Sequence, residues 1–194
     1  MQTVLQEPLA DDALLKTYRG GDHPGRWGHY GDCFSLRIDK PVSLSEFVTA
    51  FYTTPLFRTE RVILRLLAAL PSTDDDVQQL LAGTRETFAA WKLEARTDTQ
   101  LLMGDRYGKT RSWFRVTPQE SGGTLLQFGS AVASMRAADG SMKMSTGFHV
   151  LLGLHRLYSR MLLRAASARI LPRPDQRRPP GRPPLTGRGR KPIE

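Results

Sequence analysis

Two side chains in the last quarter of the sequence, His155 and Tyr158, have the types and the spacing for proton transfer. Residues three apart lie on one side of a helix, so an imidazole and a phenol at these positions can act on the same bound molecule. Such a pair can catalyse enolisation or dehydration as general acid and base. The alternative is that both side chains pack in a core or position a ligand without reacting. This second interpretation is favoured, so binding is expected rather than catalysis.

A further set of residues has the properties of a ligand-binding wall. Pockets for small molecules are mostly apolar and often aromatic, with a few polar groups that orient the ligand. Arg115 can hold a ligand carboxylate, or pair with Asp105, if its side of the strand faces inward. Plain packing in a core or at the surface is the alternative for these residues. The predicted ligand-binding residues are Trp91, Leu93, Tyr107, Trp113, Arg115, Leu151, His155 and Tyr158.

No metal or cofactor site is expected from the sequence. His23 and His29 share a Gly-rich loop, but no nearby Cys or carboxylate completes a tetrahedral site at a recognisable spacing. The loop is interpreted as a rim or lid over a cavity, or as an ordinary surface connection. The single Cys33 cannot form an internal disulfide and fits a reducing compartment, so a cytoplasmic location is expected.

The element that must position His155 and Tyr158 is a long helix, predicted over Ser145–Ile170. On a helical wheel its arginines occupy one narrow sector, and apolar side chains occupy most of the rest. This basic stripe is expected to be a solvated face, with contact to anionic lipid headgroups as the alternative. Charged residues recur too often for the helix to span a membrane. An apolar side this wide indicates a helix buried against a sheet. The arginines are Arg156, Arg160 and Arg164.

Upstream of that helix, the spacing of apolar residues predicts one strand followed by three helices. The strand, His29–Ile38, alternates apolar and polar residues. A capping box at Ser43 and Glu46 begins the first helix, and Pro55–Leu70 and Asp74–Gly83 form the other two. The second helix is expected to bury Leu56, Val62, Ile63, Leu66 and Leu67.

Four strands are predicted next, because the apolar period changes from that of a helix to two residues. Short turns separate them, so an antiparallel meander is the simplest arrangement. In the first strand, Trp91, Leu93 and Ala95 are expected to share the dry face. The predicted strands are Phe88–Thr97, Gln100–Tyr107, Arg111–Thr117 and Gly123–Arg136. Asp139-Gly140 is then expected to turn the chain into the long helix.

Four stretches carry a resemblance to known proteins. They are Thr54-Pro-Leu-Phe-Arg58, Leu101-Leu-Met-Gly-Asp-Arg106 with Ser112-Trp-Phe-Arg-Val116, and Phe148 to Arg164 with its His155-Arg-Leu-Tyr158 core. Over most of residues 28–170 the chain resembles the helix-grip superfamily, also called SRPBCC. That superfamily includes START lipid-transfer domains, birch-pollen-allergen-like proteins and polyketide cyclases, and the chain is most similar to a poorly characterised bacterial family within it. Where relatives tend to carry a His before the aromatic-Arg pair, this chain has Arg111.

The resemblance implies a cavity that binds, transports or cyclises hydrophobic molecules, but a fold alone does not assign a reaction. The predicted fold is α+β: a curved antiparallel sheet wrapped around a long C-terminal helix, with a helix pair after the first strand. We expect binding, or carriage, of a small hydrophobic ligand such as a lipid between the sheet and that helix. The alternative is a cyclase or dehydratase that uses the same cavity.

The predicted organisation has three parts: an N-terminal extension and loop (1–27), the helix-grip domain (28–170) and a disordered basic tail (171–194). Of the formal net charge of +9, the tail supplies seven basic and two acidic residues. Its Pro, Arg and Gly content cannot bury enough apolar area to fold. Two Gly-Arg-Pro-like segments resemble AT-hooks, which contact the DNA minor groove. A third hypothesis is therefore an interaction protein whose tail, residues 173–194, contacts nucleic acid; a solubilising extension is favoured.

Overall fold

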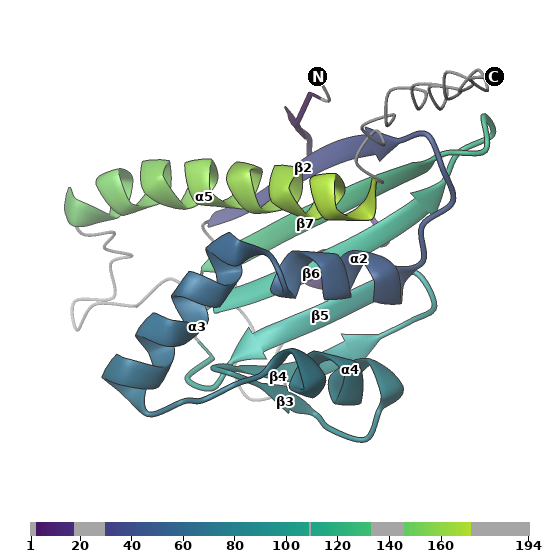
Figure 1. The fold of residues 1–194 in the computed structure, drawn as a ribbon. Coiled ribbons are helices and arrows are strands. Elements are labelled where there is room, and N and C mark those ends of the chain that lie inside the picture. The colour runs from purple at the N-terminus through teal and green to yellow at the C-terminus, as the bar shows by residue number, and fades with distance from the viewer. Residues whose placement is uncertain (1–2, 18–29, 109, 133–145, 172–194) are drawn as a thin grey trace, which may run out of the picture.

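The fold is built on one curved antiparallel sheet (Figure 1). The computed structural model describes residues 3–17, 30–108, 110–132 and 146–171. Within these ranges the strands are β1 (Leu5–Gln6), β2 (Tyr30–Ile38), β3 (Thr87–Phe88), β4 (Trp91–Arg96), β5 (Gln100–Asp105), β6 (Thr110–Pro118) and β7 (Thr124–Val132). Their order across the sheet is β1-β2-β7-β6-β5-β4-β3. The predicted meander is present from β4 to β7, and β2 pairs with β7 at its end.

The larger helices lie on one side of this sheet, here called the helical face. The helices are α1 (Leu14–Thr17), α2 (Leu44–Tyr52), α3 (Pro55–Ala68), α4 (Asp74–Ala82) and α5 (Thr146–Ile170). Figure 1 shows α5 lying over β2 and β7, with α2 beside it. A curved sheet holding a long C-terminal helix, with the pair α2 and α3 after β2, is the predicted helix-grip architecture.

Local capping explains where two of these helices begin. Ser43 Oγ accepts the Glu46 backbone N–H at 3.1 Å at the start of α2, while the Glu46 carboxylate binds Lys40 at 2.9 Å. At α4 the box is reciprocal, because Asp76 accepts the Thr73 backbone N–H and Thr73 Oγ1 accepts that of Asp76. Such caps satisfy backbone donors that a helix otherwise leaves without partners. Both helices begin where the sequence predicts.

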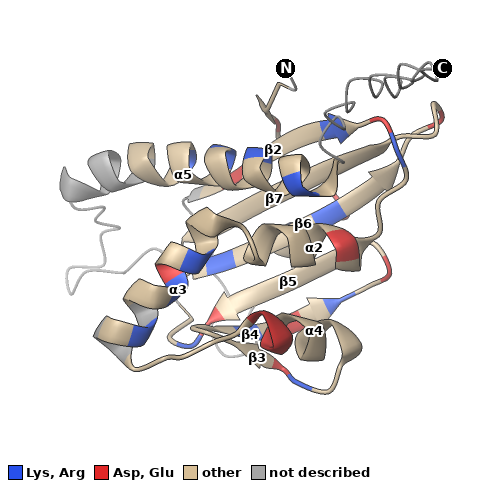
Figure 2. Cartoon of the chain, viewed as in Figure 1, with Lys and Arg blue, Asp and Glu red and all other residues tan. Residues whose placement is uncertain are grey.

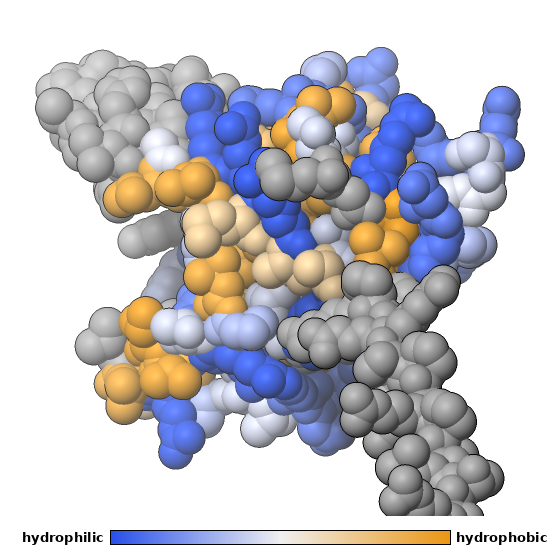
Figure 3. Space-filling model, turned by 45° about the horizontal axis from the view of Figure 1, so that its top comes forward, coloured by the Kyte–Doolittle hydropathy of each residue, from blue (hydrophilic) through white to orange (hydrophobic). Residues whose placement is uncertain are grey.

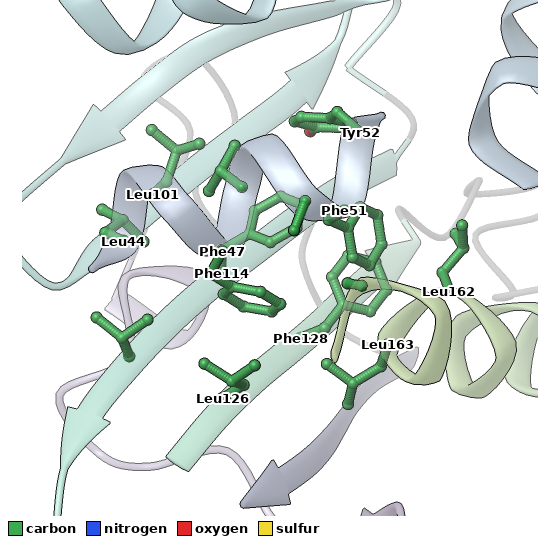
Figure 4. Close-up of a cluster of buried hydrophobic side chains, with 14 of the residues drawn as sticks. Leu44, Phe47, Phe51, Tyr52, Leu101, Phe114, Leu126, Phe128, Leu162 and Leu163 are labelled. Atoms are coloured by element: carbon green, nitrogen blue, oxygen red, sulfur yellow. The ribbon is translucent and has the colours of Figure 1, made fainter. Parts of the chain in front are cut away.

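Aromatic rings fill the space between the sheet and α2 (Figure 4). The Phe51 ring of α2 packs edge-on against the Phe114 ring of β6, with 4.9 Å between the ring centroids. The centroid of the Phe128 ring of β7 lies 4.7 Å from that of Phe51. Leu162 and Leu163 extend this cluster onto α5. Fully burying a large apolar side chain contributes roughly 1.5–3 kcal/mol, so this cluster accounts for much of the fold's stability.

The opposite side of the sheet, here called the N-terminal face, is covered by the segment that contains α1. Leu15 packs there with Cys33, Leu102 and Trp113. The Gln100 side chain joins the layers, since its Oε1 accepts the Leu14 backbone N–H at 3.0 Å and the Trp113 indole N–H at 2.8 Å. Residues 3–17 therefore pack against the sheet, although the domain boundary at residue 28 stays a prediction. Burial raises the pKa of the Cys33 thiol to about 12, which favours the neutral thiol.

The prediction for the buried side of α3 was wrong. Val62, Ile63 and Leu66 are 55%, 50% and 76% exposed, Leu56 is only half-buried, and the side chain of Leu67 lies outside the described residues. The helix packs instead through Phe57 and its neighbours, and Figure 1 shows its second half running away from the sheet. Together with the exposed Leu154, Leu157 and Met161 of α5, its apolar side chains give the hydrophobic surface around a recess in Figure 3.

The shared face predicted for Trp91, Leu93 and Ala95 was also wrong in one position. Trp91 and Leu93 pack against the main core, but the register of β4 with β5 shifts between Leu93 and Ala95. Ala95 packs instead with the cluster on the N-terminal face. An extra residue in a strand reverses the alternation beyond it, which a strict period of two cannot anticipate.

Some predicted features lie outside the described residues, namely the loop from His23 to His29, the Asp139-Gly140 turn and the tail 173–194. Figure 2 shows Lys and Arg on α5 and α3, and Asp at the start of α4. The search for membrane spans over the described residues finds no helix long and apolar enough to cross a bilayer.

Candidate functional site

A pocket of about 260 Å³ lies on the helical face, among the sheet, α2, α3 and α5. Its walls are largely aromatic, formed by Phe51, Tyr52, Phe57, Trp91 and Phe128. Polar side chains interrupt this wall, and they include Glu60, Ser112, Ser130, His155, Tyr158 and Ser159. An apolar wall with a few polar groups is the usual composition of a small-molecule site.

Three polar side chains form a connected group at one end of the pocket. Ser130 of β7 sits beside Asp32 of β2, because these residues are cross-strand partners. Asp32 Oδ1 accepts the Ser130 backbone N–H at 3.2 Å and its hydroxyl at 2.6 Å, and the Asp32 side chain is fully buried. His155 of α5 reaches the same hydroxyl, with Nε2 at 2.6 Å from Ser130 Oγ and 3.9 Å from Asp32 Oδ2.

This group orients the imidazole of His155. The Ser130 hydroxyl proton points to the Asp32 carboxylate, so Ser130 Oγ offers His155 a lone pair and Nε2–H donates to it. The neutral ring is then the tautomer with Nδ1 unprotonated, a hydrogen-bond acceptor. The arrangement differs from a nucleophilic Ser-His-Asp triad, in which the serine hydroxyl donates to the histidine. The arrangement can present Nδ1 of His155 to a ligand as a hydrogen-bond acceptor or as a base, but it does not activate the Ser130 hydroxyl for nucleophilic attack.

A second polar group joins α3 to α5 at the pocket wall. The Tyr158 hydroxyl donates to Glu60 Oε2. Burial raises the pKa of Glu60, and this hydrogen bond opposes the rise. Burial and the neighbouring Glu60 also raise the pKa of Tyr158, so the phenol keeps its proton near neutral pH. Tyr158 is therefore a donor that is already engaged with Glu60.

Two further polar groups border the pocket. The Tyr52 hydroxyl is buried, and no hydrogen-bond partner for it is present in the described part of the chain. Arg111 lies at the rim and binds Glu94 through two contacts, Nε to Oε2 at 2.5 Å and Nη2 to Oε1 at 2.7 Å. Its charge is therefore balanced within the protein by a buried bidentate ion pair. The described residues contain no group of three or more His, Cys, Asp or Glu side chains placed to hold a metal ion.

The structure brings together three of the residues that the sequence nominated. Trp91, His155 and Tyr158 all line the pocket, and the Trp91 ring lies 5.6 Å from Phe57. Leu93 packs against the main core without lining the pocket. Tyr107 is 75% exposed, with the Arg106 guanidinium 5.7 Å from its ring centroid. The side chain of Leu151 lies outside the described residues.

Two nominated residues, Trp113 and Arg115, lie on the N-terminal face and do not line this pocket. Trp113 is completely buried against α1, and Arg115 binds Asp12 at 2.7 and 3.0 Å rather than Asp105. The strand alternation placed both residues on one side correctly. That side faces the N-terminal segment, because Phe114 and Val116 occupy the helical face.

Sequence reasoning missed the residues that hold His155 and Tyr158. Asp32 and Ser130 had a signal, because each continues an alternating apolar row, with Phe34 and Phe128 as the next members. A charged or hydroxylated residue in such a row is a buried polar group that requires a partner. Glu60 had no signal in the sequence, since its contact with Tyr158 joins residues 98 apart in the chain.

Fold and pocket together define a helix-grip type of domain with an internal cavity. No protein-family model matches the chain, and no curated protein matches it. Among solved structures, CalU16 from Micromonospora echinospora is similar at 17% identity and a TM-score of 0.36, over 75% of this chain and 78% of that chain. Ara h 8.0201 is similar at 10% identity and a TM-score of 0.33, over 73% of this chain and 98% of that chain. Similarities this low carry no inference about function.

Proposed function

We propose that this protein binds, and can carry, a small hydrophobic ligand in the pocket between the sheet and α5. The observation that carries the proposal is the pocket itself, which interrupts a core of interlocked aromatic rings. Protein cores are normally packed with few voids larger than a water molecule. A space of about 260 Å³ with aromatic walls is suited to an apolar molecule, because occupancy would restore the lost packing contacts.

The proposal includes membership of the helix-grip, or SRPBCC, superfamily. The order of strand, helix pair, meander and long helix supports it, as do the four sequence stretches that resemble this superfamily. The buried Cys33 thiol fits a reducing compartment, so the proposed location is the cytoplasm.

The test is native mass spectrometry of protein purified from bacteria, repeated after organic extraction. A hydrophobic adduct in a one-to-one ratio that extraction removes is the expected result. Ser112→Phe should abolish it, because Ser112 lines the pocket and a benzyl group there fills the space. Ser121→Phe, in an exposed turn, is the matched control and should keep the adduct. An apo mass, with no uptake from a panel of fatty acid, sterol and aromatic polyketide, contradicts the proposal.

A cyclase or dehydratase is the second candidate, favoured by the contact between His155 and the Ser130–Asp32 pair. A histidine base must be held in a fixed orientation, and the hydrogen bonds of the Ser130–Asp32 pair hold the imidazole with Nδ1 as its proton acceptor. The adduct identified above, incubated with the wild-type protein, distinguishes the two functions. An enzyme converts the adduct into a new compound, detected as a loss of water for a dehydration or as a changed chromatographic retention for a cyclisation that conserves mass, and His155→Ala then keeps binding but loses this conversion. A binding protein returns the adduct unchanged.

A further inference from the structure

We infer that the pocket selects a small planar ligand whose polar end donates hydrogen bonds and carries no negative charge. This inference rests on the proposed binding function and specifies the chemical class of the ligand. It concerns the two polar ends of the pocket, the His155 group and the Glu60 group, and the charge around them.

The size and walls of the pocket restrict the body of the ligand. A volume of about 260 Å³ is slightly below the usual range of small-molecule sites, about 300–1,000 Å³, so a ring system of two or three fused rings fits and a full acyl chain does not. The rings of Phe57, Trp91 and Phe128 line the pocket and offer flat surfaces. Aromatic ligands gain from offset or edge contacts with such rings.

The His155 end of the pocket presents an acceptor. Because Ser130 Oγ takes the Nε2 proton, the neutral imidazole has its lone pair on Nδ1. Within the described residues, Nδ1 has no hydrogen-bond partner. A ligand hydroxyl or amine can donate to this atom, whereas a ligand carboxylate would face another lone pair. The hydrogen bonds of Asp32 and Ser130 thus make His155 selective for donors.

The Glu60 end also disfavours anions. Its carboxyl group already accepts the Tyr158 hydroxyl, which removes that phenol as a donor for an anionic ligand. An ionised Glu60 would repel a carboxylate, and the fully buried Asp32 lies behind His155 with the same sign. Like charges in a poorly solvated site are strongly unfavourable. A neutral or cationic group meets no such penalty.

A positive side chain in the pocket wall is engaged in an ion pair. Arg111 is buried and lines the pocket, and its two hydrogen bonds to Glu94 balance its charge. A ligand carboxylate at Arg111 would compete with the largely buried Glu94 carboxylate for the same guanidinium. Breaking a buried pair in this way is strongly destabilising. Among the described residues that line the pocket, Arg111 is therefore the one Lys or Arg side chain, and Glu94 balances its charge.

Calorimetric titration at pH 7 with four naphthalenes that differ only at position 2 tests this inference. The probes are 2-naphthol, 2-(aminomethyl)naphthalene, 2-methoxynaphthalene and 2-naphthoate. The first two donate hydrogen bonds and should bind at least about tenfold more tightly than 2-naphthoate, since an unmatched buried polar group costs about 1–3 kcal/mol. The affinity for 2-methoxynaphthalene, which is neutral and has no donor, should fall between the affinity for the two donors and the affinity for 2-naphthoate.

The outcomes separate this inference from the proposed function. Equal affinity for all four probes, or tightest binding of 2-naphthoate, overturns the inference and leaves the binding function standing. Failure of all four to bind overturns both. Two variants add a mechanistic check, with unfolding temperature as the control for folding. Glu60→Gln should improve 2-naphthoate binding several-fold without changing 2-methoxynaphthalene, and His155→Phe should remove the preference for 2-naphthol over 2-methoxynaphthalene. Glu120→Gln, in an exposed turn, should change neither.

Discussion

The environment of Glu60, in the pocket wall, changes the chemistry of its carboxyl group. Burial raises its pKa above the ordinary value of 4.5, and the hydrogen bond from Tyr158 reduces but does not cancel this effect. Folding therefore disfavours the ionised form. The corresponding stability is fully present below pH 4.5 and is lost as the pH rises through the folded-state pKa.

Glu60→Gln should remove this pH dependence. The Gln side chain cannot ionise, and its carbonyl oxygen can still accept the Tyr158 hydroxyl. Relative to the wild type, the variant should gain stability as the pH rises from about 4 to about 7. Urea unfolding at a series of pH values measures the difference. Glu120→Gln is the exposed control, and a stability difference for Glu60→Gln that is constant with pH would contradict the argument.

The buried Tyr52 hydroxyl leads to a second prediction at the residue scale. Since no partner for it is present in the described residues, Tyr52→Phe should keep or raise the unfolding temperature of the empty protein. A buried polar group without a partner costs about 1–3 kcal/mol, and its removal relieves that cost. A clear drop in unfolding temperature would show that the hydroxyl makes a stabilising contact. Phe51→Leu, in the same cluster, should lower the temperature through lost packing.

Sequence reasoning could identify individual residues only where a regular pattern made them conspicuous. His155 and Tyr158 were conspicuous as polar residues on an apolar helix side, and both line the pocket. Trp113 and Arg115 had the right residue types but lie on the other face, because alternation groups residues without saying which group faces the helices. Glu60 lacked any local signal, since tertiary packing alone gives it a role.

At the scale of elements, capping chemistry was more predictive than apolar spacing. The predicted caps at Ser43 and Gly83 mark helix ends correctly because they are local, and Gly83 has the left-handed φ of 75° that favours glycine. The apolar spacing of α3 predicted a buried stripe that is exposed. The bulge in β4 likewise depends on its pairing with β5, which no local pattern encodes.

The contact between β7 and the N-terminal face yields a prediction for Gly129. A Cβ atom there would lie 2.9 Å from the Asp32 carbonyl oxygen and 3.0 Å from the Trp113 ring, closer than such atoms pack. Gly129→Ala should therefore destabilise the fold by about 1–3 kcal/mol through overpacking. Gly31→Ala is the matched control on the neighbouring strand, where the nearest atoms are 3.6 Å away. Denaturant unfolding measures the loss of stability in each variant. Equal losses of unfolding free energy in both would count against a steric cause.

At the scale of the whole molecule, the sheet is covered on both faces, and the N-terminal segment supplies one cover. Leu15 is buried over Trp113, whereas Leu5 is 54% exposed. Leu15→Ala should cost about 2–5 kcal/mol in unfolding free energy, and Leu5→Ala much less. Similar small losses in both variants would mean that residues 3–17 are dispensable to the domain, as the predicted boundary at residue 28 implies.

The most direct test of the central claim, a ligand site on the helical face, uses the indole N–H signals of two tryptophans during NMR titration with 2-naphthol. Trp91 lines the pocket, while Trp113 is buried on the opposite face of the sheet and serves as an internal reference. Single Trp→Phe variants assign the signals. The account predicts a saturable shift of the Trp91 signal and an unchanged Trp113 signal. A shift of Trp113 without Trp91, equal shifts of both, or no shift at saturating probe would contradict it.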